Sequence, residues 1–300
     1  MRLSDNVGNT PLIPINQKGR PYTIWGKAEF MNPSGSVKDR MATYIFNQAE
    51  KEGLIKPGDV LCEATSGNTG ISFAMLAAER GYTIYIIMPS NMSEERKQMM
   101  KLYNARLIEV DEGDFDGAIE LRDEMCKKKG WFNCNQFHNP LNIEAHYKNT
   151  GPEIYQQFQK ERTELGLALP SAFIAGTGTG GTIMGIGKYL KEKWPHIKIV
   201  AIEPAESPVM SGGEPGLHGI QGIGDGSKFL VDLDFVDEVI TIKTDNAKIK
   251  ARELASEHGL FVGISAAANV LGCMEWRKGH GGEQLLTILC DRGERYFSCI

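Results

Sequence analysis

The stretch PSGSVKDR, residues 33–40, joins a loop of small residues to an expected helix. Proline, serine and glycine favour the loop, and apolar residues then recur at helical spacing from Met41 until Gly53. Lys38 is therefore expected in or next to the first helical turn, where the partial positive charge of the helix end disfavours a cation. A lysine there has a reason to lose its proton, and a neutral amine is what Schiff-base chemistry needs. The alternative is a solvated surface lysine balanced by Asp39.

Size and composition exclude several classes of protein. The 300 residues exceed one ordinary domain, which favours two lobes or one large α/β unit. A net charge of −5 without a long basic run argues against a nucleic-acid partner. No stretch approaches the roughly 18 apolar residues of a membrane span, and the N-terminus lacks the apolar core of a signal peptide. The six cysteines form no close pair, so we expect reduced thiols in a cytoplasmic protein, with neither disulfides nor a metal site.

Apolar strands alternate with helical patterns along two blocks of the chain. The first block contains strands 60–64, 83–88, 106–110 and 131–133 and helices 39–52, 69–80, 94–103 and 114–129, with Ser93 expected as a helix N-cap. The second contains strands 172–175, 197–202, 236–242, 260–262 and 284–289 and helices 150–160, 182–193, 245–258 and 265–276. This pattern predicts an α/β protein with two doubly wound, parallel-sheet units that separate near residue 145. Because ligands of such sheets bind at the carboxyl ends of strands, the loops that follow strands are the candidate sites.

The loop GTGTGGT, residues 176–182, joins a strand to a helix. Its glycines let the backbone approach an anion, and the N–H groups at the helix start point towards it, so a phosphate is the expected ligand. A competing interpretation is a nicotinamide dehydrogenase. Gly176, Gly178 and Gly181 satisfy the pattern G-x-G-x-x-G, and Glu203 ends the next strand, where a dinucleotide site has its acidic residue.

Two further loops precede helices. The loop TSGNTG, residues 65–70, offers hydroxyls and backbone N–H groups that suit a small carboxylate, and Asn68 can both donate and accept hydrogen bonds. Helix capping is the simpler interpretation of this loop. Ser265 begins another helix after a short strand, where it is either an N-cap or a ligand contact.

Taken together, these residues resemble the pyridoxal-phosphate enzymes of fold type II. The most similar members are the cysteine synthases (O-acetylserine sulfhydrylases) and the catalytic core of cystathionine β-synthase. The resemblance runs nearly end to end in one order, through Gly8–Leu12, Asn32–Arg40, Thr65–Gly70, Met88–Arg96, Gln136–Asn142, Thr150–Ile154, Gly178–Thr182, Gln221–Gly224, Gly263–Ser265 and Asp291–Tyr296.

The resemblance implies a role for each matching position. Lys38 matches the catalytic lysine that forms a Schiff base with pyridoxal 5'-phosphate. Asn68 matches the partner of the cofactor's 3'-oxygen, and Ser265 matches the partner of its pyridine nitrogen. The loop around the cofactor phosphate corresponds to Gly178, Thr179, Gly180, Gly181 and Thr182. The group that holds the substrate α-carboxylate corresponds to Thr65, Ser66, Gly67, Thr69 and Gln136.

The resemblance also implies an architecture. Its fold is tryptophan synthase β-like, with the cofactor in the cleft between a smaller mobile lobe and a larger lobe. The smaller lobe corresponds to residues 32–146 with 1–9, and the larger to 10–31 with 147–300. The family forms homodimers, and serine acetyltransferase is a candidate second partner.

The activity implied is β-replacement that forms L-cysteine from O-acetyl-L-serine and sulfide through an aminoacrylate intermediate. The alternatives within the class are a cystathionine β-synthase-like enzyme, an enzyme that uses O-phosphoserine, and a cysteine desulfhydrase. The sequence leaves the choice of activated serine and nucleophile open. Two departures from the pattern bear on that choice: Ala266-Ala267 stands where many relatives have Ser-Gly, and Ser227-Lys228 where many have aromatic and proline residues.

Overall fold

The computed structural model describes residues 1–16, 19, 21–65, 67–224 and 226–299. The chain divides into two compact units, and each is described by itself. Unit 1 comprises Met1–Val7 and Asn32–Asn142, and unit 2 comprises Gly8–Met31 and Ile143–Ile300. In the part of the chain that the structure describes, no helix is both long and apolar enough to span a membrane.

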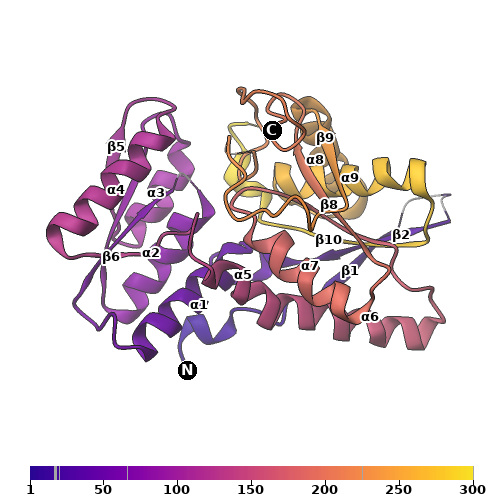
Figure 1. The fold of residues 1–300 in the computed structure, drawn as a ribbon, viewed down its shortest axis with the longest axis horizontal. Coiled ribbons are helices and arrows are strands. Elements are labelled where there is room, and N and C mark those ends of the chain that lie inside the picture. The colour runs from indigo at the N-terminus through magenta and orange to yellow at the C-terminus, as the bar shows by residue number, and fades with distance from the viewer. Residues whose placement is uncertain (17–18, 20, 66, 225, 300) are drawn as a thin grey trace. The chain divides into compact units, whose positions relative to one another are not determined.

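Unit 1 is an alternation of strands and helices (Figure 1). Its strands are β3 (Val60–Ala64), β4 (Thr83–Pro89), β5 (Arg106–Val110) and β6 (Phe132–Asn133). Its helices are the 3-10 helix η1 (Leu3–Asn6), α1 (Lys38–Lys51), α2 (Asn68–Arg80), α3 (Glu94–Leu102) and α4 (Phe115–Lys129). The short helix α5 (Leu141–Ala145) begins at the end of this unit.

The four described strands of unit 1 form a parallel sheet in the order β5-β4-β3-β6. Successive side chains of a strand point to opposite faces, which shows how the sheet is covered. Ile87 packs in a buried cluster with Ala118 and Cys126 of α4. Its neighbour Ile86 lies on the other face, next to Gly70 of α2. Helices therefore cover both faces, as the near-continuous apolar strands predicted.

Unit 2 contains a larger mixed set of elements. Its strands are β1 (Leu12–Asn16), β2 (Thr23–Lys27), β7 (Ala172–Gly176), β8 (Lys198–Pro204), β9 (Glu238–Ile242) and β10 (Gln284–Ile288). Its helices are η2 (Glu29–Met31), the π-helix η3 (His146–Thr150), α6 (Gly151–Leu165), α7 (Gly181–Lys193), α8 (Thr244–His258), α9 (Ile264–His280) and η4 (Gly293–Tyr296).

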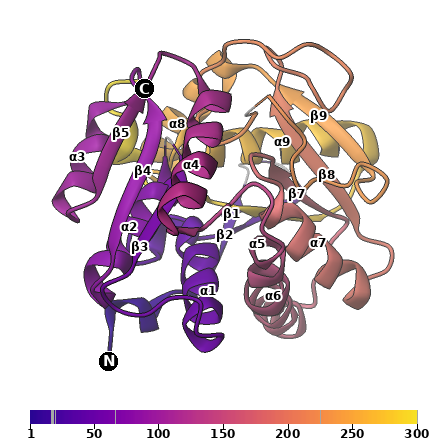
Figure 2. The same cartoon turned by 60° about the vertical axis from the view of Figure 1, so that its left-hand side comes forward.

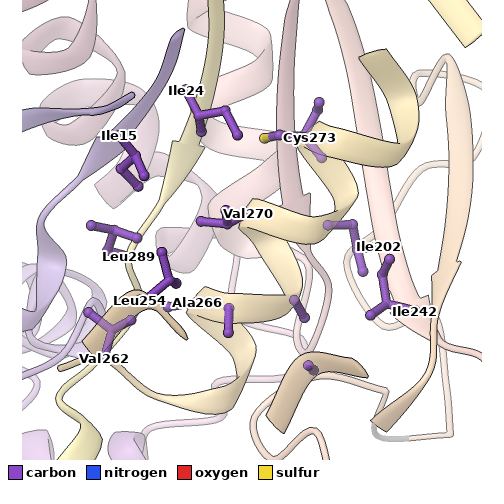
Figure 3. Close-up of a cluster of buried hydrophobic side chains, with 14 of the residues drawn as sticks. Ile15, Ile24, Ile202, Ile242, Leu254, Val262, Ala266, Val270, Cys273 and Leu289 are labelled. Atoms are coloured by element: carbon purple, nitrogen blue, oxygen red, sulfur yellow. The ribbon is translucent and has the colours of Figure 1, made fainter. Parts of the chain in front are cut away.

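The six described strands of unit 2 lie in the order β1-β2-β10-β7-β8-β9. All neighbours are parallel except β1, which pairs antiparallel with β2 at the edge. Figure 3 shows the core on one face, where Ile24 of β2 and Ile202 of β8 lie with Val270 and Cys273 of α9. On the other face, Trp25 of β2 contacts Phe158 of α6 edge to face, with the ring centroids 5.7 Å apart. The sheet is thus covered on both faces (Figure 2).

The strand order reverses once in each sheet, and this positions the candidate loops. In unit 1 the chain runs outward through β3, β4 and β5 and then places β6 on the other side of β3. In unit 2 it runs outward through β7, β8 and β9 and then places β10 on the other side of β7. Crevices form outside the carboxyl ends of strands at such switch points. The loop after β3 and the loop after β7, at these switch points, are two of the loops that the sequence singled out.

One local prediction was wrong, and two were confirmed with a difference in detail. Residues 260–262 form no strand among the described residues, and Val262 makes an isolated bridge to Arg292. The helix predicted over 150–160 is confirmed as α6 (Gly151–Leu165), but the helical region begins earlier, at Leu141, and includes the π-helix η3. Ser93 holds the N-cap position of α3, but its buried hydroxyl has no hydrogen-bond partner among the described residues.

Candidate active site

Lys38 is the first residue of α1, which confirms its predicted place in the first helical turn. Its backbone N–H donates to Ser36 Oγ at 3.3 Å, so the loop caps the helix at this point. The side chain is partly buried. An amine is thereby held at the positive end of a 14-residue helix.

Asp39 joins the lysine loop to the neighbouring helix α2. Its fully buried carboxylate accepts hydrogen bonds from Ser34 N at 2.7 Å, from Ser34 Oγ and from Ser72 Oγ at 2.5 Å. Ser72 Oγ also lies 3.0 Å from the carbonyl oxygen of Asn68, the first residue of α2. Asp39 is therefore not the solvated counterion of the surface-lysine alternative, because it fastens the start of α1 to the start of α2.

The loop after β3 and the segment after β6 meet at the switch point of unit 1. Thr69 Oγ1 donates to Gln136 Oε1 at 2.7 Å, and Gln136 Nε2 donates to the carbonyl oxygen of Ala64 at 3.1 Å. Gly67 N donates to Thr65 Oγ1 at 3.2 Å. Thr65, Thr69 and Gln136 are all buried. Ser66, the other predicted member of this group, lies outside the described residues.

A buried ion pair that the sequence did not suggest lies beneath this cluster. Glu63, in β3, is fully buried, and its Oε1 is 3.1 Å from Nη1 of Arg122 in α4, whose side chain is 1% exposed. The other oxygen, Oε2, accepts a hydrogen bond from Gln136 N at 3.0 Å. Burial raises the pKa of Glu63, while the Arg122 guanidinium and the N–H groups of Gln136 and Ala64 oppose the rise.

In unit 2 the glycine loop leads from β7 into α7, as predicted. Gly180 is the N-cap of α7 with φ of 88°, so the following N–H groups turn towards the loop. A Cβ atom at Gly180 would lie 2.8 Å from Val231 N, and one at Gly176 would lie 2.8 Å from Ile223 Cγ2. Thr182 Oγ1 lies 3.2 Å from His146 Nε2. Gly178 is partly buried, and Thr179 and Gly181 are buried in the same loop.

Of two buried polar residues near the ends of these strands, Asn269 supports the glycine loop and Glu203 does not. Asn269 of α9 bridges β7 and β10, because its Oδ1 accepts from Gly176 N at 2.7 Å and its Nδ2 donates to Ile288 O at 2.8 Å. Asn269 was not predicted from the sequence, although it is a polar residue among the mostly apolar buried positions of α9. Glu203 accepts hydrogen bonds from Met210 N, Ser211 N and Ser211 Oγ at 2.5–3.0 Å. Its carboxylate is thus committed to its own loop, which disfavours the ribose contact of a dinucleotide enzyme.

Ser265 is buried in the first turn of α9. Gly263 holds the N-cap position, so the interpretation of Ser265 as the N-cap is wrong. The Ser265 hydroxyl is a neutral group at the positive end of a 17-residue helix.

Comparison with known proteins identifies the family to which this chain belongs. The sequence profile of the family described as "Pyridoxal-phosphate dependent enzyme" matches residues 3–291. The chain belongs to the pyridoxal-phosphate-dependent enzymes. Within them it is a fold type II member of the cysteine synthase family, because it is 42% identical to the cysteine synthase of Staphylococcus aureus over 97% of this chain and 94% of the relative.

Solved structures of enzymes with different named activities have the same fold. The hydrogen sulfide-producing enzyme of Fusobacterium nucleatum has a TM-score of 0.91 and 40% identity, over 99% of this chain and 90% of that chain. An O-ureido-L-serine synthase has a TM-score of 0.91 and 35% identity, over 100% of this chain and 94% of that chain.

Each unit, considered separately, contains residues whose chemistry fits a part of pyridoxal phosphate. The loop 176–182 contains no acidic side chain, and an added Cβ atom at Gly176 or Gly180 would meet neighbouring atoms. A glycine backbone at the N-terminus of the 13-residue helix α7 suits a phosphate. In unit 1, the amine of Lys38 is a group of the kind that would react with the aldehyde carbon. No group of three or more His, Cys, Asp or Glu within the described ranges could hold a metal ion.

Proposed function

We propose that the protein is a cysteine synthase that replaces the β-acetoxy group of O-acetyl-L-serine with sulfide. One observation carries the proposal: the switch point of unit 1 gathers an amide and two hydroxyls, on Gln136, Thr69 and Thr65, at the start of a helix. The start of α1, where Lys38 lies, is fastened to the same helix through Asp39 and Ser72. Chemistry on an α-amino acid requires a group that binds the substrate carboxylate and an amine that holds the cofactor and moves a proton, and unit 1 contains candidates for both.

The roles of the individual residues follow the family pattern. Lys38 would hold the cofactor, and Asn68 would face its 3'-oxygen. Ser265 would face its ring nitrogen. The cofactor phosphate would be bound by Gly178, Thr179, Gly180, Gly181 and Thr182, and the substrate α-carboxylate by Thr65, Ser66, Gly67, Thr69 and Gln136.

The chain's own residues then bind the substrate and move a proton. Bound pyridoxal phosphate supplies the electron-withdrawing ring that acidifies the Cα–H bond and lets the β-substituent leave. The carboxylate group fixes the orientation of that bond, and Lys38 Nζ takes the Cα proton. Serine at position 265 donates or accepts a hydrogen bond without supplying negative charge. It therefore favours rapid loss of acetate over chemistry that needs a strongly protonated ring nitrogen.

Visible absorbance and turnover test the proposal. Lys38→Ala should lose the visible absorbance of the bound cofactor and lower cysteine formation by about 10³-fold or more, because both attachment and proton transfer fail. Lys51→Ala, at the other end of the same helix, should leave both unchanged. A wild-type sample that stays colourless with added pyridoxal phosphate would contradict the assignment.

A second candidate activity is release of sulfide from L-cysteine. The observation that favours it is the 40% identity to the Fusobacterium enzyme titled hydrogen sulfide-producing. Rates of sulfide formation from cysteine and of cysteine formation from O-acetyl-L-serine, measured on one preparation, decide between the two. O-phosphoserine and homocysteine belong in the same substrate panel.

Assembly and motion are further proposals, supported by the resemblance to the family. We propose a homodimer in which residues 32–146 with 1–9 form the mobile lobe and residues 10–31 with 147–300 the larger lobe, acting in the cytoplasm. Serine acetyltransferase is a candidate partner. Light scattering of the purified protein tests the dimer, and a monomeric mass would refute it.

A further inference from the structure

We propose that the buried pair Glu63–Arg122 is a positioning device for the carboxylate-binding amide of Gln136. The inference rests on the proposed function, since it assumes that Gln136 meets the substrate carboxylate. It adds Glu63 and Arg122, neither of which belongs to the predicted site. Arg122 lies in α4, which covers the opposite face of the sheet from α2.

The pair fixes the backbone of Gln136. Glu63 Oε2 accepts from Gln136 N at 3.0 Å, and Oε1 accepts from Ala64 N at 2.9 Å and from Arg122 Nη1 at 3.1 Å. The carboxylate therefore clamps the segment after β6 to the last residue of β3. Because Glu63 is fully buried, no water competes for these hydrogen bonds.

The side chain of Gln136 is held from its other end. Its Nε2 donates one hydrogen to Ala64 O and its Oε1 accepts from Thr69 Oγ1. An amide nitrogen carries two hydrogens, so this arrangement leaves the second for a ligand oxygen. A shift of the Gln136 backbone would move that hydrogen relative to the loop at 65–70.

The positive charge of Arg122 is what keeps Glu63 an acceptor. Removing one partner from a buried ion pair leaves an uncompensated charge, which the remaining group avoids by taking up a proton. A protonated Glu63 gives one acceptor position to its own hydrogen and is a weaker acceptor than a carboxylate, so its hydrogen bonds from Gln136 N and Ala64 N would weaken. The clamp on Gln136 would then open even if the fold survived.

Asp123 orients the guanidinium from the surface. Its Oδ1 accepts from Arg122 Nε at 3.0 Å, lies 2.9 Å from Arg122 Nη2 and accepts from Asn133 Nδ2 at 2.8 Å. Its side chain is 55% exposed, so it can be replaced without leaving a buried charge. Asp123 therefore offers a milder way to disturb the same pair.

The test uses holoenzyme and compares two buried arginines of unit 1. Arg122→Met should raise the KM for O-acetyl-L-serine by about tenfold to a hundredfold with the cofactor absorbance retained, because only the carboxylate contact is displaced. Arg80→Met is the matched control, since Arg80 is buried and its Nη1 lies 3.0 Å from Glu50 Oε2. It should lose comparable stability with an unchanged KM. Equal KM values for the two variants would overturn the proposal.

A binding measurement separates this proposal from the assigned reaction. L-serine and ethanolamine differ by the α-carboxylate, and the binding of each is followed by the change in cofactor absorbance. The affinity for L-serine divided by that for ethanolamine should fall in Arg122→Met. It should also fall, by about threefold, in Asp123→Ala, and this second variant tests the proposal if Arg122→Met does not fold. An unchanged ratio in Asp123→Ala and Arg122→Met refutes positioning. Failure of the wild type to consume O-acetyl-L-serine would refute the reaction alone.

Discussion

At the scale of single residues, Gly180 sets the geometry of the phosphate loop. Its φ of 88° lies in the left-handed region, and an added Cβ atom would meet the backbone nitrogen of Val231. The conformation alone costs a non-glycine residue about 1–2 kcal/mol. Gly180→Ala should therefore displace the loop and weaken the binding of pyridoxal phosphate by roughly tenfold or more.

Titration of the cofactor into the apoprotein, followed by visible absorbance, measures this effect. Gly259→Ala is the control, because Gly259 ends α8 with φ of 66° and an added Cβ atom would have no neighbour within 4 Å. It should lower stability by a similar amount without changing cofactor affinity. Equal affinities for the two variants would show that the loop tolerates the extra atom.

Residue-level predictions succeeded where local rules decide the structure. Lys38 could be placed because small residues before it and helical spacing after it fix where a helix starts. Ser93 shows the limit of such rules, since it occupies the N-cap position but makes no capping hydrogen bond. Glu63 and Arg122 could not be paired from sequence, because 59 positions separate them and only the packing of α4 on the sheet brings them together.

At the scale of elements, Asn269 connects the carboxyl ends of β7 and β10. It replaces the hydrogen bonds that these strand ends cannot make to each other, and it is fully buried. Asn269→Ala leaves the N–H of Gly176 and the carbonyl of Ile288 without this partner. The variant should lose about 3 kcal/mol of unfolding free energy, from two buried groups at roughly 1–3 kcal/mol each.

Urea denaturation of holoenzyme measures the loss, and Asn269→Asp is the informative control. Aspartate keeps an oxygen for Gly176 N but turns a second carboxylate oxygen towards Ile288 O and buries an unpaired charge, so a loss at least as large as that of Asn269→Ala is expected. If Asn269→Ala is as stable as the wild type, water must replace the bridge and the side chain is not a structural link.

Element types were easier to predict than their ends and their irregular parts. Parallel strands could be recognised because burial on both faces demands continuous apolar runs. The π-helix η3 was missed, since the extra residue in its turn leaves no periodic signal in the sequence. Residues 260–262 have the composition of a strand, but among the described residues they form no ladder, and Val262 makes an isolated bridge to Arg292.

At the scale of the whole molecule, the loop after β3 and the loop after β7 lie where the strand order of each sheet reverses. A parallel α/β sheet has its crevice where the strand order reverses, and both candidate loops follow the first strand of a block. The order of the strands could not be predicted from the sequence, because the positions of β6 beside β3 and of β10 beside β7 depend on packing between distant segments. The chemistry of the loops could be read without it.

The division into two units leads to a prediction about folding. Each unit has its own sheet and its own buried cluster, so each can unfold separately when no ligand is bound. In the proposed function Lys38 of unit 1 and the loop 178–182 of unit 2 hold one cofactor molecule. A ligand that binds only the folded state stabilises every unit that has to be folded for binding. The cofactor should therefore make the two units unfold together.

Hydrogen exchange at increasing urea distinguishes the units through peptides that contain β3 and β10. Without cofactor, the two peptides should lose protection at different urea concentrations, and with cofactor at nearly the same one. In Lys38→Ala the covalent link is lost while the phosphate loop is intact, so added cofactor should protect the β10 peptide more than the β3 peptide. Equal protection of both peptides in that variant would mean that the lysine does not couple the units. The coupling would then have to come from non-covalent contacts, and the shared cofactor attachment would not be the reason that the two units act as one enzyme.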